Sequence, residues 1–363
     1  MTNTPSPGDE QGPVSGLPDL LDFEYEELAA FVAQLGEKPF RAKQIWKWLY
    51  EGVPDFSGMS NLPASLRGRL AQICTTGGLT IVRKQVSAQD GTTKYLFRLR
   101  DGHLVESVLM RYKYGLSACI STQVGCRMGC AFCASAKLGL ERNLMVGEMV
   151  GQVLGMMADA RDRIGHVVLM GIGEPFDNYE PAVAFLRRIN RADTLEIGWR
   201  KLTVSTCGIV PGILRFAGEG LPVNLSVSLH APTQALREQT MPVARRWPLP
   251  ELLDACWAYV DQTGRRITFE YALVNGWNDS AEQARQLAAL CRGRLCHVNL
   301  IPVNPVPGTP FSQGTTAAIR GFLQILEDAG IAVTVRRELG SDIEAACGQL
   351  RRDVVQKVGE EEL

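Results

Sequence analysis

The sequence predicts an α/β protein in which parallel strands, covered by helices, form an open or closed barrel. Three observations support this prediction. Short apolar strands alternate with helical stretches from Ala118 onward, which is typical of parallel sheets. A helical pattern precedes them from about Leu20 to Cys74. Between these two parts, a period-two pattern from Leu79 to Tyr112 indicates a small antiparallel meander.

The composition is that of a globular protein with a sizeable core. The chain has 363 residues, of which 45% are hydrophobic and 21% are charged. Its net charge is −1, so any nucleic-acid binding must come from local basic patches. We expect neither a signal peptide nor a membrane span, because residues 1–17 lack a basic and an apolar region and no apolar run reaches the length that a span needs. Ten cysteines without an export signal indicate a reducing compartment, so we expect a soluble cytoplasmic protein.

The same patterns divide the chain into five parts. Residues 1–17 are polar and rich in proline and glycine, and we expect a disordered tail. Residues 18–76 form a helical accessory domain, 77–115 the meander, 116–351 the barrel and 352–363 a solvated tail.

The accessory domain centres on a helix that we expect at residues 40–50. Phe40, Ile45, Trp48 and Leu49 share one apolar stripe of this helix. In the meander, strands are expected at 80–86, 93–99 and 105–111, with turns at Gln89–Gly91 and at Asp101–Gly102.

In the barrel, the first strand is expected near Ser117–Ser121, and the cysteine-rich loop follows it. The other expected strands are Val167–Met170, Leu202–Ser205, Asn224–Leu229, Ile267–Tyr271, His297–Pro302 and Val333–Arg336. The expected helices are Gly147–Arg161, Tyr179–Arg191, Pro250–Gln262, Ser280–Leu290 and Ala317–Ala329. Ligands of such barrels bind at the carboxyl ends of the strands.

Three cysteines carry the strongest chemical signal. Cys126, Cys130 and Cys133 have C-x-x-x-C-x-x-C spacing on one short loop, and no fourth cysteine follows at a matching offset. Three thiolates can hold three irons of a cubane cluster and leave the fourth iron open to a substrate. The alternatives are a zinc loop or unrelated core thiols. Zinc loops favour a two-residue gap and a second ligand pair, whereas the four histidines here are scattered singly.

This loop, with Phe132 before its last cysteine, resembles the radical S-adenosylmethionine (SAM) superfamily. The resemblance implies a partial (β/α)₆ barrel, a [4Fe–4S] cluster on the three cysteines and SAM bound to the open iron. Residues 170–175, Met-Gly-Ile-Gly-Glu-Pro, resemble the segment that holds the SAM amino group, which makes Gly173 and Glu174 cofactor-binding residues. The other implied SAM contacts are Ser205, Ser228, Leu229, His230 and Asn304.

Two further cysteines narrow the resemblance. Cys119 precedes the cluster loop, and Cys347 lies in a Gly340–Arg351 motif near the C-terminus. Together with Val105–Val108, they resemble the bacterial rRNA adenine-C2 methyltransferases of the superfamily, and the likeness runs from about Leu20 to Arg351. It implies 2-methyladenosine formation in 23S rRNA and in tRNA next to the anticodon.

The resemblance also implies a role for each residue outside the cluster. Carbon 2 of adenine is electron-poor and cannot attack a SAM methyl group, whereas a thiolate can. Cys347 is implied as the S-methylcysteine carrier for one SAM, and a second SAM supplies the radical that activates the methyl group. Glu106 is implied as the proton acceptor and Cys119 as the resolving thiol, with a transient Cys119–Cys347 disulfide. The alternative for Glu106 is a solvated carboxylate on the outer face of the meander.

The expected RNA contacts are basic and aromatic side chains, which suit phosphates and unstacked bases. Those candidates are Arg41, Lys43, Trp46, Lys47, Trp48, Arg83, Lys84, Lys94, Arg98, Arg100, Arg111, Lys113, Arg336 and Arg337. Expected partners are 23S rRNA in a protein-poor or precursor form, tRNA, and an electron donor such as flavodoxin or ferredoxin. We expect a monomer that does not contact membranes.

Three other functions fit parts of the sequence. The nearest is methylation of carbon 8 of the same rRNA adenine, which confers antibiotic resistance. A glycyl-radical activating enzyme needs only the three cluster cysteines, and an RNA-binding iron–sulfur sensor does not explain Gly171–Pro175. The remaining cysteines are interpreted as structural: Cys74, Cys207, Cys256, Cys291 and Cys296.

Overall fold

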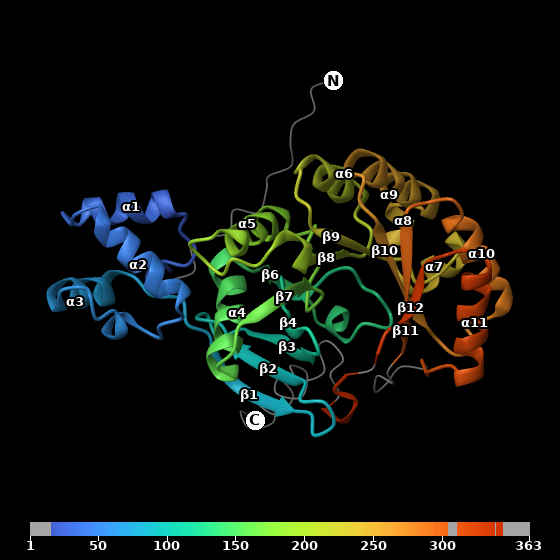
Figure 1. Cartoon of the computed structure of the whole chain (residues 1–363), viewed down its shortest axis with the longest axis horizontal. Helices are drawn as coiled ribbons and strands as arrows, with labels where there is room; N and C mark the ends of the chain where they lie inside the picture. Colours follow the sequence, from blue (N-terminus) through green and yellow to red (C-terminus); the bar gives the residue numbers. More distant parts are fainter. Residues whose placement is uncertain (1–15, 304–310, 338, 344–363) are drawn as a thin grey trace.

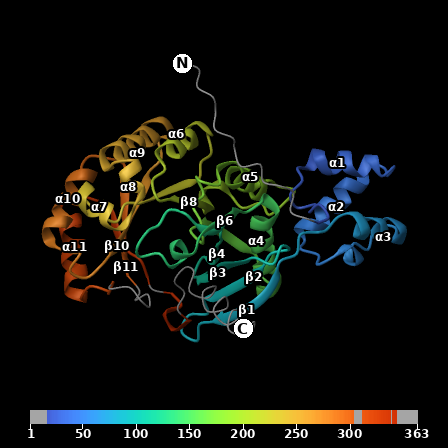
Figure 2. The same ribbon diagram turned by 180° about the vertical axis from the view of Figure 1, so that it is seen from behind.

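The structure is a computed structural model that describes residues 16–303, 311–337 and 339–343. Ten strands form one open sheet in the order β1-β2-β3-β4-β7-β8-β9-β10-β11-β12, and β5 and β6 form a separate hairpin (Figure 1). The helices form an arc around these strands, and both views show α1, α2 and α3 at one side of the molecule (Figure 2). The predicted α/β class is confirmed.

The barrel part of the sheet consists of seven strands, and each pairs in parallel with its neighbours in the part. These strands are β4 (Gly115–Cys119), β7 (Ile164–Leu169), β8 (Leu202–Thr206), β9 (Asn224–Ser228), β10 (Ile267–Leu273), β11 (Cys296–Pro302) and β12 (Val333–Val335). The helices that cover them include α4 (Val146–Ala160), α5 (Tyr179–Asn190), the shorter α6 (Val210–Gly218), α9 (Leu249–Thr263), α10 (Ala281–Cys291) and α11 (Thr316–Asp328). All the predicted barrel strands and helices are present, with ends that differ by a few residues.

The meander is part of the same sheet. Its strands are β1 (Thr80–Val86), β2 (Thr93–Arg98) and β3 (Leu104–Tyr112), and they pair antiparallel as predicted. β3 then pairs antiparallel with β4, so Val108 lies opposite Cys119. Because β4 belongs to both ladders, the meander and the barrel share one continuous set of backbone hydrogen bonds.

The N-terminal helices α1 (Tyr25–Gln34), α2 (Phe40–Tyr50) and α3 (Ala64–Ile73) pack on the barrel through α5. The Arg188 guanidinium of α5 is buried, donates to the Leu21 carbonyl and the Tyr50 hydroxyl, and pairs with Glu24. It also lies over the Trp46 ring, at 5.2 Å from the centroid.

This packing corrects the predicted stripe of α2. Phe40 is 50% exposed, whereas Trp46, expected to contact RNA, is buried. The pattern alone could not show that the barrel supplies an arginine to cover Trp46.

Several short elements were not predicted. They are the hairpin strands β5 (Gln123–Cys126) and β6 (Gly139–Asn143), and the helices α6, α7 (Gln234–Thr240) and α8 (Val243–Arg246). Each short strand or helix offers too few residues for a period to be visible. No helix in the described part of the chain is both long and apolar enough to cross a bilayer.

Candidate active site

A cavity of about 300 Å³ lies where the cysteine loop covers the carboxyl ends of the parallel strands. It brings together eight of the predicted site residues: Cys126, Cys130, Cys133, Gly173, Glu174, Ser205, Ser228 and His230. Leu229 is fully buried next to them, and Asn304 lies outside the described residues. Three of the predicted strand-end residues, Ser205, Ser228 and His230, therefore line the same cavity as the loop cysteines.

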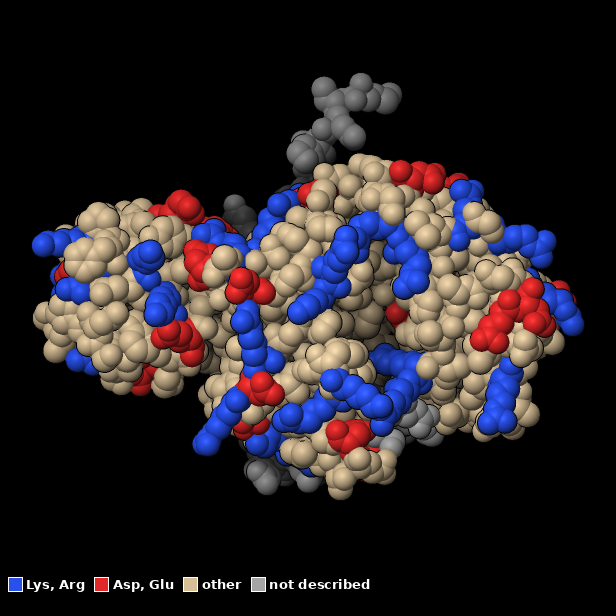
Figure 3. Space-filling view, viewed as in Figure 1, with Lys and Arg blue, Asp and Glu red and all other residues tan. Residues whose placement is uncertain are grey.

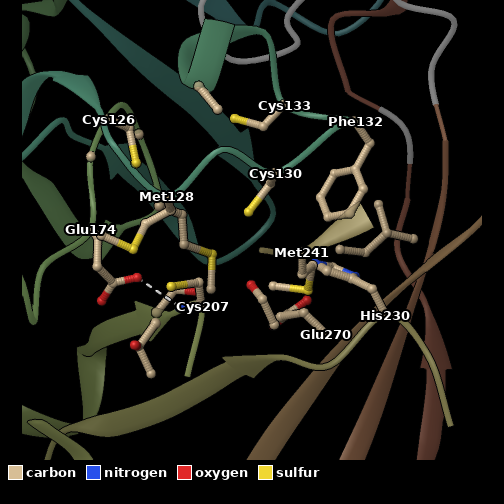
Figure 4. Close-up of a pocket in the computed structure, with 18 of the residues that line it drawn as sticks. Cys126, Met128, Cys130, Phe132, Cys133, Glu174, Cys207, His230, Met241 and Glu270 are labelled. Carbon is tan, nitrogen blue, oxygen red and sulfur yellow. Dashed lines mark hydrogen bonds between the residues drawn. The ribbon is translucent and has the colours of Figure 1, made fainter. Parts of the chain in front are cut away.

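The three loop cysteines point their sulfur atoms into the same part of this cavity (Figure 4). Strand β5 ends at Cys126. In the loop that follows, the Cys133 amide donates a hydrogen bond to the Cys130 carbonyl (3.0 Å). Burial raises the pKa of Cys126 to about 12 and also raises the pKa of Cys130. In the described residues no three His, Cys, Asp or Glu side chains are close enough to hold one metal ion. A cubane cluster does not need that arrangement, because each cysteine binds a different iron.

Arg237 gives an independent reason to place an anionic group beside these thiols. Its guanidinium is fully buried and donates to the carbonyls of Cys207 (2.7 Å), Ser228 and Leu229. Its Nη1 atom has no hydrogen-bond partner, and no carboxylate pairs with it within the described ranges. Burial lowers the pKa of Arg237, and the thiols of Cys207 and Cys130 oppose that effect. A buried cation without a counter-ion fits a cluster held by thiolates, whose negative charge it would offset.

The Gly173–Glu174 turn packs directly on the start of the cysteine loop. Gly173 has a φ of +114°, and a Cβ there would lie 2.7 Å from the Thr122 hydroxyl oxygen. The Glu174 amide donates to the Gln123 side-chain oxygen (2.9 Å). The sequence motif therefore corresponds to a close backbone contact that a side chain would prevent.

The Glu174 carboxylate is buried and already accepts two backbone hydrogen bonds. One oxygen accepts from the Phe176 amide (3.0 Å) and the other from the Cys207 amide (2.7 Å; Figure 4). Burial raises the pKa of Glu174 above its ordinary value. The side chains of Thr206 and Cys207 also hydrogen-bond to this carboxylate, so an ammonium donor would share its acceptor positions with them.

His230 is held as a neutral imidazole at the cavity wall. Its backbone has a φ of +57°, and its Nδ1 accepts a hydrogen bond from the Ala272 amide (2.9 Å). Burial, and after it the charge of Arg237, lowers the pKa of His230 to about 3. With Nδ1 accepting, Nε2 carries the proton and can donate to a ligand. The Phe132 ring packs edge-to-face on the imidazole at 4.7 Å.

Glu106 and Cys119 line a second, smaller cavity, which adjoins the first at Gly171. Glu106 is 4% exposed, which excludes the solvated carboxylate. The Ser121 hydroxyl donates to the Glu106 carbonyl (2.6 Å) and accepts from the Ile172 amide (2.9 Å), which ties β3 to the turn after β7. Burial raises the pKa of Cys119 to about 11, although Arg336 opposes the shift.

The predicted RNA contact at Lys94 and the predicted disulfide are not seen in the described residues. Lys94, expected to contact RNA, is 1% exposed and lines the cavity of Glu106 and Cys119. The nine cysteines within the described part are free thiols, so no disulfide is seen there. Cys347, the other half of the predicted transient disulfide, lies outside the described residues.

Sequence reasoning missed two residues of the main cavity. Cys207, interpreted as structural, lines it next to Glu174, and the signal was its position just after the strand that ends near Ser205. Glu270 also lines it, is buried, and accepts a hydrogen bond from the Asn299 amide group (2.7 Å). The feature of the sequence that could have identified Glu270 is that it is the one charged residue of this strand.

Comparisons with known proteins agree with this geometry. Residues 18–76 match the model of the ribosomal RNA large subunit methyltransferase N-terminal domain, and residues 120–288 match the radical SAM superfamily. A probable dual-specificity RNA methyltransferase RlmN from Desulforamulus reducens is 52% identical over 335 residues, covering 92% of this chain and 96% of that protein. A relative of the same name from Geobacillus kaustophilus is 50% identical over 95% of both chains.

A solved structure shows the same architecture. The radical SAM methyltransferase from Sphaerobacter thermophilus superposes with a TM-score of 0.88 and is 46% identical. The match covers 92% of this chain and 98% of that one, so the likeness includes the accessory helices, the meander and the barrel.

Proposed function

Because the chain belongs to the family of dual-specificity RNA methyltransferases RlmN, we propose that it methylates carbon 2 of adenosine in 23S rRNA and, next to the anticodon, in tRNA. The observation that carries the proposal is the pairing of two cavities. Glu106 and Cys119 line one, the three loop cysteines line the other, and Gly171 belongs to both. A base, a thiol and a radical source thus serve one substrate position.

The cofactors are a [4Fe–4S] cluster and SAM. Cys126, Cys130 and Cys133 would hold the cluster, and Arg237 would offset its charge. SAM would contact the turn at Gly173 and Glu174 and the strand-end residues Ser205, Ser228, Leu229, His230 and Asn304. When bound, cluster and SAM together supply a 5′-deoxyadenosyl radical.

The other roles belong to residues around the small cavity. The Cys347 sulfur would accept a methyl group from one SAM, one hydrogen atom of that methyl group would pass to the 5′-deoxyadenosyl radical, and its carbon would then bond to carbon 2 of the adenine. When carbon 2 loses its proton, the remaining unpaired electron would return to the cluster. Glu106 would accept the proton that leaves carbon 2, since a buried carboxylate without bulk water is an effective base. The Cys119 sulfur would then bond to the Cys347 sulfur and free the methylated base. The raised pKa of Cys119 keeps it protonated until that step.

RNA would approach the face shown in Figure 3. Lys and Arg side chains lie on both sides of a central hollow there. Arg336 lines the main cavity. The exposed candidates on the accessory domain and the meander are Lys43, Lys47, Lys84, Arg98, Arg100, Arg111 and Lys113. We further propose that a flavodoxin or ferredoxin is the reductant, that the RNA is in a protein-poor or precursor form, and that the enzyme is a monomer.

The test is anaerobic turnover of the reconstituted enzyme with SAM, dithionite and either an rRNA fragment or a tRNA. Digestion to nucleosides and mass spectrometry should give 2-methyladenosine from both, whereas 8-methyladenosine would contradict the regiochemistry. Cys347→Ala should still form 5′-deoxyadenosine but lose methylation by at least a hundredfold. Cys74→Ala, a buried thiol in the accessory domain, is the matched control and should keep its activity. Radical formation without RNA methylation in the unaltered enzyme would favour a glycyl-radical activating enzyme.

A further inference from the structure

The short segment that precedes Cys347 is fastened to the turn between β1 and β2 by two reciprocal hydrogen bonds. The Gly340 amide donates to an Asp90 carboxylate oxygen, and the Ala88 amide donates to an Asp342 carboxylate oxygen, both at 2.8 Å. Figure 1 shows the red segment of residues 339–343 beside this turn. We call these four residues the clasp.

Both sides of the clasp are organised locally. In the turn, the other Asp90 oxygen accepts from the Thr92 amide (2.8 Å), and the Ser87 hydroxyl accepts from the Asp90 amide (3.2 Å). In the segment, the Ile343 amide donates to the Gly340 carbonyl (3.1 Å). Charged acceptors make stronger hydrogen bonds with backbone amides than neutral acceptors do. The Ser87 hydroxyl and then the Ala88 amide lower the pKa of Asp342, so its carboxylate is charged at neutral pH.

The clasp lies close in sequence to the small cavity of Glu106 and Cys119. The turn ends at Thr92, and Lys94, two residues later on β2, lines that cavity. On the other side, Cys347 follows Asp342 by only five residues. An extended chain of that length reaches about 17 Å. The clasp thus limits where the Cys347 sulfur can be, relative to the two groups that must act on it.

Without the clasp, the nearest upstream hydrogen bond to the rest of the fold among the described residues runs from the Arg336 amide to the Leu300 carbonyl (2.8 Å). Cys347 follows Arg336 by eleven residues. The effective concentration of a tethered group falls roughly as the −3/2 power of tether length, which amounts to about threefold here. Loss of orientation adds to that factor.

We propose that Asp90 and Asp342 are positioning residues for the methyl-carrying thiol of Cys347. This inference rests on the proposed function, because it assumes that Cys347 is the carrier. The clasp acts on the steps that need Cys347, namely its methylation and its attack on the base. It does not act on the cavity that holds the loop cysteines.

The test compares Asp342→Ala, Asp342→Asn and Asp328→Ala in the full-length reconstituted enzyme. Asp328 is a matched control, because it ends α11 and its carboxylate accepts from the Gln324 side chain. In Asp342→Ala, hydrogen exchange at the Ala88 amide should be at least tenfold faster. In this variant the Gly340–Asp90 hydrogen bond remains, so RNA methylation and S-methylation of Cys347 should fall about twofold in kcat with little change in KM. Combining Asp342→Ala with Asp90→Ala should make the fall about three- to tenfold. The yield of 5′-deoxyadenosine per methylated base should rise by a similar factor.

Asp342→Asn keeps a neutral acceptor oxygen and should recover part of each loss, which a general folding defect would not do. Asp90→Ala should speed exchange at the Gly340 amide and give the same kinetic pattern. Cys347→Ala is assayed in parallel. If it still methylates RNA, the proposed function fails and the clasp inference with it. If it is inactive while Asp342→Ala keeps normal kcat and coupling, the clasp inference alone is overturned.

Discussion

Gly125 sets the geometry of the cluster loop. It has a φ of +79° immediately before Cys126, and a Cβ at this position would lie 1.9 Å from the Gly139 carbonyl oxygen. That oxygen belongs to the backbone of β6, so the clash cannot be relieved by a side-chain rotation. The hairpin that carries the first thiol therefore closes only with glycine there.

Replacing Gly125 with alanine should cost about 3 kcal/mol or more in the free energy of unfolding and lower the iron bound after reconstitution several-fold. The physical reason is that β5 and β6 must separate, which moves Cys126 away from Cys130 and Cys133. Gly264→Ala is the control. Its φ of +64° and ψ of +14° lie in the left-handed helical region, and a Cβ there meets no atom within 4 Å, so its cost should be about 1 kcal/mol. Equal iron content in the two variants would contradict the argument.

The buried His230 should make the free energy of unfolding depend on pH. Its pKa is lowered to about 3 in the folded protein, whereas an unfolded histidine titrates near 6.5. As pH falls below 6.5, only the unfolded chain takes up this proton, so stability that is present above pH 6.5 is lost progressively toward pH 3. At pH 5 the loss from this residue is about 2 kcal/mol. Urea unfolding of the cluster-free protein at pH 7.5 and 5 checks it: His230→Gln should show a decline smaller by that amount, and an unchanged decline would refute it.

At the scale of single residues, spacing in the sequence identified the chemistry but could not identify burial. The three loop cysteines and the strand-end serines face one cavity as predicted, because their positions follow from the parallel sheet. Trp46 and Lys94 are of residue types that commonly contact RNA, but both are buried in the folded protein. Only the packed structure shows that burial.

At the scale of elements, the accessory helices depend on one arginine of the barrel. Arg188 is buried and bonds to Leu21, Glu24 and Tyr50, all of which belong to the N-terminal part. Removing the guanidinium leaves the Leu21 carbonyl and the buried Tyr50 hydroxyl without their donor, which costs about 1–3 kcal/mol for each group, whereas the half-exposed Glu24 carboxylate can be solvated.

Arg188→Ala should therefore loosen the helices from the barrel. Limited proteolysis should cut between residues 74 and 80 at a higher rate, and the midpoint of thermal unfolding should fall. The neighbouring Arg187→Ala removes an exposed ion pair with Glu219 and should change the free energy of unfolding by less than about 1 kcal/mol. Similar proteolysis of both variants would show that Arg188 does not hold the helices in place.

Whether a helix or strand could be predicted from the sequence depended mainly on its length. Barrel helices of ten or more residues, such as α5 and α11, and strands flanked by clear turns, such as β8, were predicted almost to the residue. The β5–β6 hairpin has a cysteine and two glycines in nine strand residues, and its pairing depends on a backbone contact instead of a hydrophobic period.

At the scale of the whole molecule, the order of helices, meander and barrel was visible in the sequence, but their fusion into one sheet was not. A meander and a barrel have separate patterns, and nothing in either predicts that β3 and β4 pair with each other. The proximity of Glu106 and Cys119 follows from that pairing, since Glu106 lies on β3 and Cys119 on β4.

The shared sheet has a consequence for recombination among relatives. A chimera joined between residues 115 and 116 would pair a β3 from one parent with a β4 from another, and a one-residue slip would turn Glu106 to the opposite face. A junction between α3 and β1, near residues 74–79, cuts no strand pairing in the ten-stranded sheet. Exchange of whole accessory helices is therefore compatible with this architecture, whereas the meander must be inherited together with the barrel that it completes.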